Sequence, residues 1–194
     1  MSFETPASPL TGVATDPYTR LLSTASLEFL LMELVPMAER IVDEQGAKNT
    51  GGGAIDDEER RESMFYRLEG LGFRVGQGLA ERFSRDRPRF TDHLDVIKFL
   101  CKDLWTILFQ KQIDNLKTNH RGVYVLTDHT FKPFSRMSTP NQAETVAQAQ
   151  PHLWFPCGLI RGALASMGID STVHAETTNL PGATFQIKTT PTKL

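Results

Sequence analysis

The sequence contains few cysteines and no large excess of charge of either sign. Only Cys101 and Cys157 occur among 194 residues, and their spacing matches neither a zinc site nor a disulfide scaffold. Each lies in an apolar helical pattern, so we expect buried free thiols in a reducing compartment. Lysine and arginine total 21 against 23 aspartates and glutamates, which gives a net charge of -2. This balance offers no global field for nucleic acid or anionic lipid.

Long hydrophobic runs are also missing. No stretch of about 18 or more uninterrupted apolar residues occurs, which argues against a transmembrane helix. Residues 1–17 lack the charged start and apolar stretch of a secretory signal. We therefore expect a cytoplasmic protein that associates with membranes at most peripherally.

Recognisable catalytic and cofactor-binding motifs are absent as well. The glycines at 70, 72 and 76 follow a helical pattern, whereas a dinucleotide fingerprint follows a strand. None of the five histidines stands at a metal-binding spacing from another ligand. Cys157 and His152 could supply a thiol and a base, but no third group to orient the base is evident. We expect no cofactor, no metal and no enzymatic activity.

The residue pattern predicts a single α+β domain, with helices packed on a twisted antiparallel sheet. Residues 1–18 are rich in Pro, Thr and Ser and are predicted to form a disordered tail before a domain at 19–190. Gly46 is expected to stop the first helix, and residues 46–55 to form a flexible insert.

Apolar spacing of three and four predicts helices over residues 21–45, 56–83, 91–108 and 157–167. Alternating patterns predict strands over residues 115–120, 122–128, 131–134, 169–177 and 183–189. Residues 139–150 are a polar stretch. In the turn at Asn179–Gly182, Pro181 is expected to preset one dihedral and Gly182 to permit the other. The glycines inside the second helix, at 70, 72, 76 and 78, predict close approach of a neighbouring element.

The first helix has two apolar faces. The face expected to meet the core contains Leu27, Leu30, Leu31, Leu34, Ala38 and Ile41. The opposite face has the spacing of a helix-packing seam and contains Leu22, Ala25, Phe29, Met32 and Pro36. A surface helix of a monomer needs only one apolar stripe, so the second is buried within the domain or against another chain. We favour a partner interface, in which each large side chain contributes roughly 1.5–3 kcal/mol.

Two further features carry alternative functions. Four arginines lie between the second and third helices, and they form either a solvated linker or a contact for an acidic partner or membrane surface: Arg82, Arg85, Arg87 and Arg89. Four large apolar residues enclose either a filled core or a channel for a small molecule or acyl chain: Phe65, Phe73, Leu104 and Trp105.

Five ordered runs, within a span from about Leu21 to Lys188, are more specific together than any one alone. They are Glu69–Gly76, His93–Phe99, Cys101–Trp105, Asn119–Tyr124 and Pro156–Gly162. Taken together, these runs resemble subunit 6 of TRAPP, the transport protein particle. The resemblance implies an α+β fold whose members pair through their first helices.

The same resemblance implies a non-catalytic scaffold subunit of a complex that tethers vesicles and promotes nucleotide exchange on a Rab GTPase. Its setting would be ER-to-Golgi and Golgi traffic. The implied partners are other small TRAPP subunits, in a heterodimer or, for the isolated chain, a homodimer, and the larger TRAPP assembly. The acyl-channel paralogue has a modified cysteine before its third helix. Here Arg87–Arg89 stands at that place, so acylation is not expected.

Overall fold

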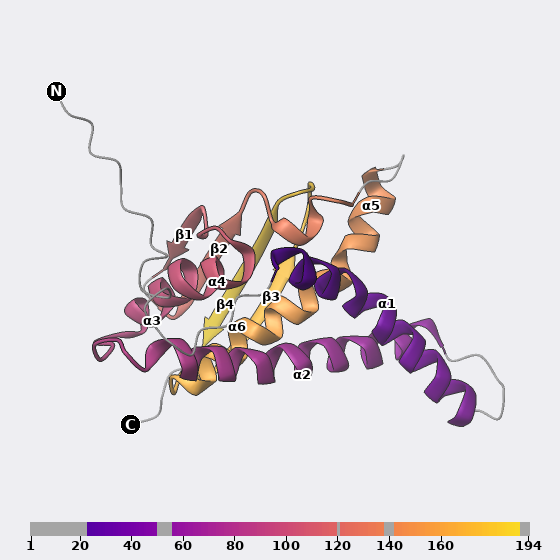
Figure 1. The fold of residues 1–194 in the computed structure, drawn as a ribbon, viewed down its shortest axis with the longest axis horizontal. Helices are drawn as coiled ribbons and strands as arrows, with labels where there is room; N and C mark the ends of the chain where they lie inside the picture. Colours follow the sequence, from indigo (N-terminus) through magenta and orange to yellow (C-terminus); the bar gives the residue numbers. More distant parts are fainter. Residues whose placement is uncertain (1–22, 50–55, 120, 138–141, 191–194) are drawn as a thin grey trace.

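Residues 23–49, 56–119, 121–137 and 142–190 are described by a computed structural model (Figure 1). The predicted tail at residues 1–18, most of the predicted insert, and Leu22 lie outside this part of the chain. The described part has helices packed against a four-stranded antiparallel sheet, which confirms the predicted α+β class.

The sheet has the strand order β1–β2–β4–β3, and each neighbouring pair is antiparallel. Its strands are β1 (Asn115–Thr118), β2 (Val123–Asp128), β3 (Ser171–Glu176) and β4 (Ala183–Thr189). The register places Leu126 opposite both Leu116 and Phe185. Because side chains alternate between the two faces of a strand, this register gathers the buried residues of β2 and β4 on one face.

The helices form two hydrophobic clusters, and the larger one lies on this face of the sheet. The helices are α1 (Thr24–Asn49), α2 (Asp57–Ser84), α3 (His93–Phe99), α4 (Trp105–Phe109), α5 (Gln142–Ala149) and α6 (Trp154–Ser166). A π-helical turn, η2 (Leu100–Leu104), joins α3 to α4, and the 3-10 turns are η3 (Lys132–Phe134) and η4 (Gln150–Leu153). Helix α6 packs on both β3 and α2, and α1 packs on α2, η3 and η4 (Figure 1).

Glycines bring the backbones of α2 and α6 together. A Cβ added at Gly72 or Gly76 would lie 2.1 Å from a carbonyl oxygen of α6. A Cβ added at Gly158 or Gly162 would lie 1.9 or 2.0 Å from a carbonyl oxygen of α2. The close approach predicted from the glycines of the second helix is therefore confirmed at Gly72 and Gly76.

The other two glycines of the second helix do not contribute to this packing. A Cβ added at Gly70 or Gly78 would meet nothing within 4 Å, so the predicted close approach is wrong at these positions. Gly46 does not stop α1 either, because the helix continues to Asn49. One interior glycine costs only about 1 kcal/mol. Ahead of this glycine α1 also contacts α2, where Arg60 Nε donates to Asp43 Oδ1 at 2.7 Å.

Two segments adopt a different structure from the one expected. Residues 131–134, predicted as a strand, contain Phe131 followed by η3. Pro133 has no N–H for a ladder, and the rings of Phe131 and Phe134 pack in the core with their centres 5.0 Å apart. The polar stretch at 139–150 contains α5, which buries Ala149.

Two smaller differences concern prolines. Helix α6 begins at Trp154 and contains Pro156 in its first turn, where a missing N–H is tolerated. In the turn at residues 179–182, the peptide bond between Leu180 and Pro181 is cis. Gly182 does not have a positive φ, so its expected role, to permit a dihedral that other residues avoid, is wrong.

Candidate partner interface

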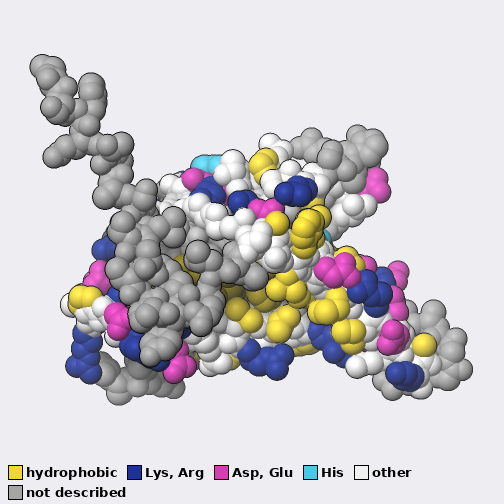
Figure 2. All heavy atoms as spheres, viewed as in Figure 1, with side chains coloured by type: hydrophobic (Ala, Val, Ile, Leu, Met, Phe, Trp, Pro, Cys, Tyr) yellow, Lys and Arg dark blue, Asp and Glu magenta, His cyan; other side chains and the backbone are white. Residues whose placement is uncertain are grey.

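The N-terminal half of α1 presents exposed apolar side chains. Phe29, Leu30 and Met32 are 61%, 57% and 40% exposed, and in the described part of the chain Tyr66 is the other large hydrophobic residue in this class. Figure 2 shows hydrophobic side chains gathered over this half of α1 and beside α2. Contiguous exposed apolar surface of this kind marks contact sites for other molecules.

The seam predicted from the sequence lies partly on this surface. Phe29 and Met32 are exposed, Ala25 and Pro36 are half-buried, and Leu22 lies outside the described residues. These positions share one side of the helix through their three- and four-residue spacing. Contact between this seam and another protein stays a prediction.

The core face of α1 is rotated from the one expected. Of the residues assigned to the core from their spacing, Leu34 and Ala38 are buried but Leu30 is exposed. Val35 and Val42, which were not assigned to the core, are buried. These buried residues belong to a cluster with Met64 of α2. The shift arises because α1 rests on α2 and the 3-10 turns together, and not on one flat surface. It leaves Leu30 on the outside.

As a result, apolar side chains flank both sides of an acidic residue on the outer surface of α1. At about 100° per residue, Phe29 and Leu30 lie on opposite sides of Glu33. Glu33 is itself held along the helix, since Arg40 Nη2 donates to its Oε1 at 2.5 Å. The candidate interface is therefore wider than the predicted seam.

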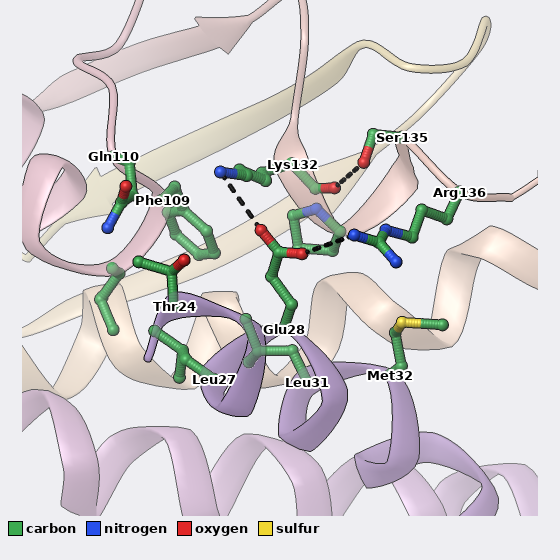
Figure 3. A pocket seen from close by; sticks show the side chains of 12 residues that line it. Thr24, Leu27, Glu28, Leu31, Met32, Phe109, Gln110, Lys132, Ser135 and Arg136 are labelled. Atoms are coloured by element: carbon green, nitrogen blue, oxygen red, sulfur yellow. Dashed lines mark hydrogen bonds and ion pairs between the residues drawn. The ribbon is translucent and has the colours of Figure 1, made fainter. Parts of the chain in front are cut away.

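A hollow of about 30 Å³ lies against the same half of α1 (Figure 3). Its α1 residues follow helical spacing, and its other residues come from α4 and the segment around η3. The lining residues are Thr24, Leu27, Glu28, Leu31, Met32, Leu108, Phe109, Gln110, Lys132, Pro133, Ser135 and Arg136. Met32 belongs both to the predicted seam and to the wall of this hollow.

Charged residues form one edge of the hollow. Glu28 points toward two cations in Figure 3: its Oε1 lies 3.3 Å from Lys132 Nζ, and its Oε2 lies 3.0 Å from Arg136 Nη2. The Glu28 side chain is 24% exposed, against 40% for Lys132 and 59% for Arg136. The more exposed positive groups therefore outnumber the carboxylate at the mouth of the hollow.

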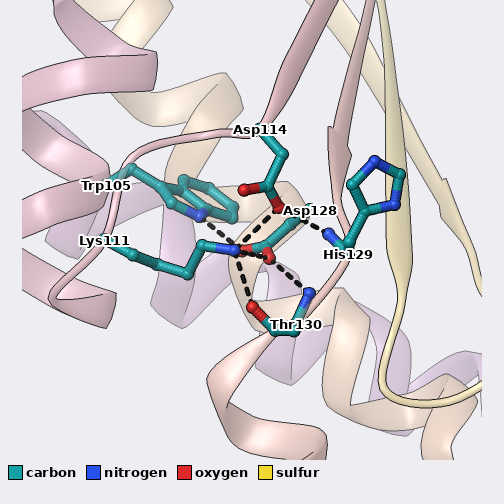
Figure 4. A network of polar contacts seen from close by, with 6 residues as sticks. All are labelled: Trp105, Lys111, Asp114, Asp128, His129 and Thr130. Carbon is teal, nitrogen blue, oxygen red and sulfur yellow. Dashed lines mark hydrogen bonds and ion pairs between the residues drawn. The ribbon is translucent and has the colours of Figure 1, made fainter.

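A polar network fixes the segment that leads into this wall (Figure 4). The carboxylate of the fully buried Asp128 accepts hydrogen bonds from Trp105 Nε1 at 2.9 Å, Lys111 Nζ at 2.6 Å and Thr130 N at 3.0 Å. Lys111 Nζ also donates to Asp114 Oδ2 at 2.8 Å. Because η3 begins two residues after Thr130, the network sets the position of Lys132 at the hollow.

Neighbouring charges shift the pKa of two groups in this network. The hydrogen bond from Lys111 holds the pKa of Asp114 below its usual value, and the backbone N–H of His129 adds to this effect. Burial alone would lower the pKa of Lys111, but its bonds to Asp114 and Asp128 outweigh burial and raise it. Both groups therefore stay charged over a wider pH range.

The four arginines predicted to contact an acidic partner lie at the C-terminal end of α2 and just after it. Arg82 is in its last turn, and Arg85, Arg87 and Arg89 follow in an exposed connection. The guanidinium of Arg87 pairs with Asp103 and lies 5.1 Å from the ring centre of Phe99. Arg87 and Arg89 line a separate hollow of about 260 Å³, together with two lysines and two aspartates.

The residues suggested for an acyl channel do not gather around one space. Trp105 is fully buried, and its ring centre lies 4.6 Å from that of Phe109. Phe65 packs against the cluster that contains Val35 and Met64, and its ring centre lies 5.8 Å from that of Trp154. Phe73 lies under the guanidinium of Arg161 on the surface between α2 and α6.

Of the thiol and imidazole considered as a nucleophile pair, Cys157 is buried and His152 is half-buried, and both are neutral near pH 7. Burial raises the pKa of Cys157 to about 12 and lowers the pKa of His152 to about 4. The described ranges contain no group of three or more His, Cys, Asp or Glu that could hold a metal ion. Nor does any helix described here combine the length and hydropathy that crossing a membrane requires.

Comparison with known proteins defines the class of the chain. Residues 27–190 match the family model described as transport protein particle (TRAPP) component. Trafficking protein particle complex subunit 6B of Homo sapiens is 53% identical over 121 residues, which span 62% of this chain and 75% of the relative. Subunit 6A of Homo sapiens is 51% identical over 120 residues, spanning 62% and 74%. An uncharacterized protein of Schizosaccharomyces pombe is 41% identical over 170 residues, spanning 88% and 65%.

The chain belongs to the TRAPP component family and, within it, to the subunit 6 family. The resemblance inferred from the five sequence runs is confirmed. Among solved structures, trafficking protein particle complex subunit 3 from Naegleria fowleri, covalently bound to palmitic acid, superposes with a TM-score of 0.64. This match covers 87% of this chain and 97% of the other at 13% identity, so it shows the fold alone.

Proposed function

We propose that this chain is a non-catalytic scaffold subunit of the TRAPP complex and pairs with another small TRAPP subunit through the outer surface of α1. Family membership supports the complex, and the exposed Phe29, Leu30 and Met32 support the surface. Within the complex, the chain serves vesicle tethering and nucleotide exchange on a Rab GTPase in ER-to-Golgi and Golgi traffic. It acts from the cytoplasmic side of these membranes.

The three exposed residues of α1 do not supply enough binding free energy for such a pairing on their own. Each large apolar side chain contributes roughly 1.5–3 kcal/mol when buried. Association costs on the order of 4–15 kcal/mol in lost rigid-body freedom. The contact must therefore extend to neighbouring apolar surface, and α2 offers the partly buried Leu71, Val75 and Leu79 beside α1. We infer a two-helix contact surface.

Co-purification tests this proposal. The tagged chain is isolated from cells, and its partners are identified by mass spectrometry. The double substitution Phe29→Arg with Met32→Asp is expected to remove the paired subunit, because it places charges in an apolar contact. Tyr66→Arg is the matched control, since it alters an exposed aromatic residue outside the α1 surface. Undiminished recovery of the paired subunit with the double variant would contradict the assignment of the surface.

A contact between the arginine connection and an acidic partner is a second proposal. It is supported by the hollow that Arg87 and Arg89 line with Lys98 and Lys102, because these four cations outnumber the two carboxylates in the lining, Asp95 and Asp103. Arg85→Glu with Arg89→Glu tests it, because these substitutions spare the pair between Arg87 and Asp103. Loss of a co-purifying protein that survives the Phe29 and Met32 changes would assign a separate partner to the connection. An unchanged set of partners would count against this contact.

A further inference from the structure

We propose that the hollow beside α1 receives one aliphatic side chain from the paired subunit, and that Arg136 and Lys132 bind a carboxylate next to that side chain. The inference rests on the proposed function, because it specifies the chemistry that the paired subunit presents to α1. The partner segment would be a helix with Leu, Ile, Val or Met three or four residues from Asp or Glu, so that both lie on one face.

The size of the hollow determines what can enter it. Its volume is about 30 Å³, and one water molecule needs about 10–15 Å³ on this scale. The hollow therefore has room for two or three groups the size of a water molecule, which corresponds to the end of one aliphatic side chain and not to a lipid chain. The walls match such a group, because Leu27, Leu31, Leu108 and Phe109 surround it with apolar atoms.

Charge at the mouth of the hollow points to an acidic neighbour. Two cations share the single carboxylate of Glu28, through contacts of 3.3 and 3.0 Å. A guanidinium has five N–H donors, and one nitrogen of Arg136 faces Glu28. Glu28 is the least exposed of the three and orients the cations toward the outside. An incoming carboxylate would complete the charge balance and could bind the guanidinium in a bidentate manner.

The position of the hollow makes its use compatible with the α1 contact. Met32 forms part of its wall and is 40% exposed on the outer surface. A helix that packs on Phe29 and Met32 therefore passes the mouth of the hollow. Electrostatic complementarity at such a rim contributes mainly to partner choice and association rate. The hollow would thus help this chain to select one small subunit over others.

Titration of the recombinant paired subunit, identified by co-purification, tests the inference. Affinity is measured at about 50 mM and about 300 mM salt, because screening weakens an exposed ion pair. Arg136→Gln is expected to weaken binding about tenfold at low salt and to reduce the salt dependence. Arg121→Gln is the matched control, because it makes the same change in an exposed turn next to the sheet. It should alter the affinity less than about twofold.

A second variant tests the apolar part of the site. Leu27→Phe fills the hollow from within and is expected to weaken binding about tenfold at both salt concentrations. Thermal melting of each variant shows that it is folded. Should Leu27→Phe unfold the chain, Thr24→Leu adds volume to the same wall from an exposed position and keeps the test available.

The outcomes separate this inference from the proposed function. If Phe29→Arg with Met32→Asp abolishes binding while Arg136→Gln and Leu27→Phe bind like wild type, the inference fails and the pairing surface stands. If the double variant binds normally, the pairing surface itself is wrong. Self-association of the isolated chain that Arg136→Gln removes would assign the hollow to a second copy, which overturns the choice of occupant.

Discussion

Trp105 Nε1 donates a hydrogen bond of 2.9 Å to Oδ2 of Asp128, and both residues are fully buried. The indole comes from α4 and the carboxylate from the end of β2, so the bond ties the helical layer to the sheet (Figure 4). The buried negative charge is compensated by Lys111 Nζ at 2.6 Å. A buried carboxylate without such partners would be too costly to keep ionised.

Removing this carboxylate should strongly destabilise the fold. We expect Asp128→Ala to lower the free energy of unfolding by about 3–5 kcal/mol, because the buried Trp105 N–H loses its acceptor and Lys111 Nζ keeps only Asp114 and Thr130 as acceptors. Trp105→Phe should cost about 1–3 kcal/mol. Urea unfolding followed by circular dichroism measures both. Glu33→Ala, which removes an exposed ion pair, should change stability by less than about 1 kcal/mol.

The same network predicts a dependence of stability on pH. The pKa of Asp114 is lowered in the folded protein, first by its bond with Lys111. A carboxyl group with a lowered folded pKa stabilises the fold above its unfolded pKa, near 3.9 for aspartate, and loses this effect as the pH falls through the folded value. The difference in melting temperature between wild type and Asp114→Asn should therefore be largest above about pH 5 and shrink toward about pH 2. A difference that stays constant over this range would contradict the role of the ion pair.

The sequence predicted the helices and strands that carry strong periodicity and missed those set by tertiary contacts. The third helix shows a continuous apolar pattern, yet η2 interrupts it. There the carbonyl of Cys101 accepts a hydrogen bond from Ile113 N at 3.0 Å, a contact between segments that spacing does not reveal. Likewise η3 is fixed by Phe131, whose N–H donates to Pro181 O at 2.9 Å.

Only part of the candidate site could be predicted from the sequence, because the rest depends on tertiary contacts. Spacing placed Phe29 and Met32 on one face of the first helix. The hollow depends on residues about a hundred positions away, such as Arg136, whose ion pair with Glu28 has no local signature. Two cations within one short segment, Lys132 and Arg136, were the only hint in the sequence, and their spacing alone does not identify a carboxylate on α1.

The contact between α2 and α6 gives a sharp test of packing. Gly76→Ala should destabilise the protein by at least about 1–3 kcal/mol, because its Cβ would lie 2.1 Å from the backbone oxygen of Leu159. Gly78→Ala is the matched control in the same helix, where the added Cβ meets nothing within 4 Å. It should stabilise the helix by about 0.5–1 kcal/mol, because alanine has less conformational freedom to lose. Thermal unfolding of both variants decides whether the two changes have opposite signs.

The two cysteines should be unreactive in the folded protein. Burial raises the pKa of Cys101 and of Cys157 to about 12, so the thiolate that reacts with alkylating reagents is scarce at neutral pH. We expect iodoacetamide to leave both thiols unmodified in buffer and to modify both in denaturant, as measured by intact mass. Rapid labelling of either residue in the native protein would show that its helix opens locally.

The rotation of α1 can be tested with two leucines that the sequence placed on the same face. Leu34 is 6% exposed and Leu30 is 57% exposed. Leu34→Ala should lower the free energy of unfolding by about 2–4 kcal/mol, because it removes buried methyl groups and leaves a cavity. Leu30→Ala should change it by less than about 0.5 kcal/mol and should instead weaken pairing with the other subunit. Equal destabilisation by the two substitutions would place Leu30 in the core, as its spacing first indicated, and would reduce the partner surface to the side of α1 that carries Phe29 and Met32.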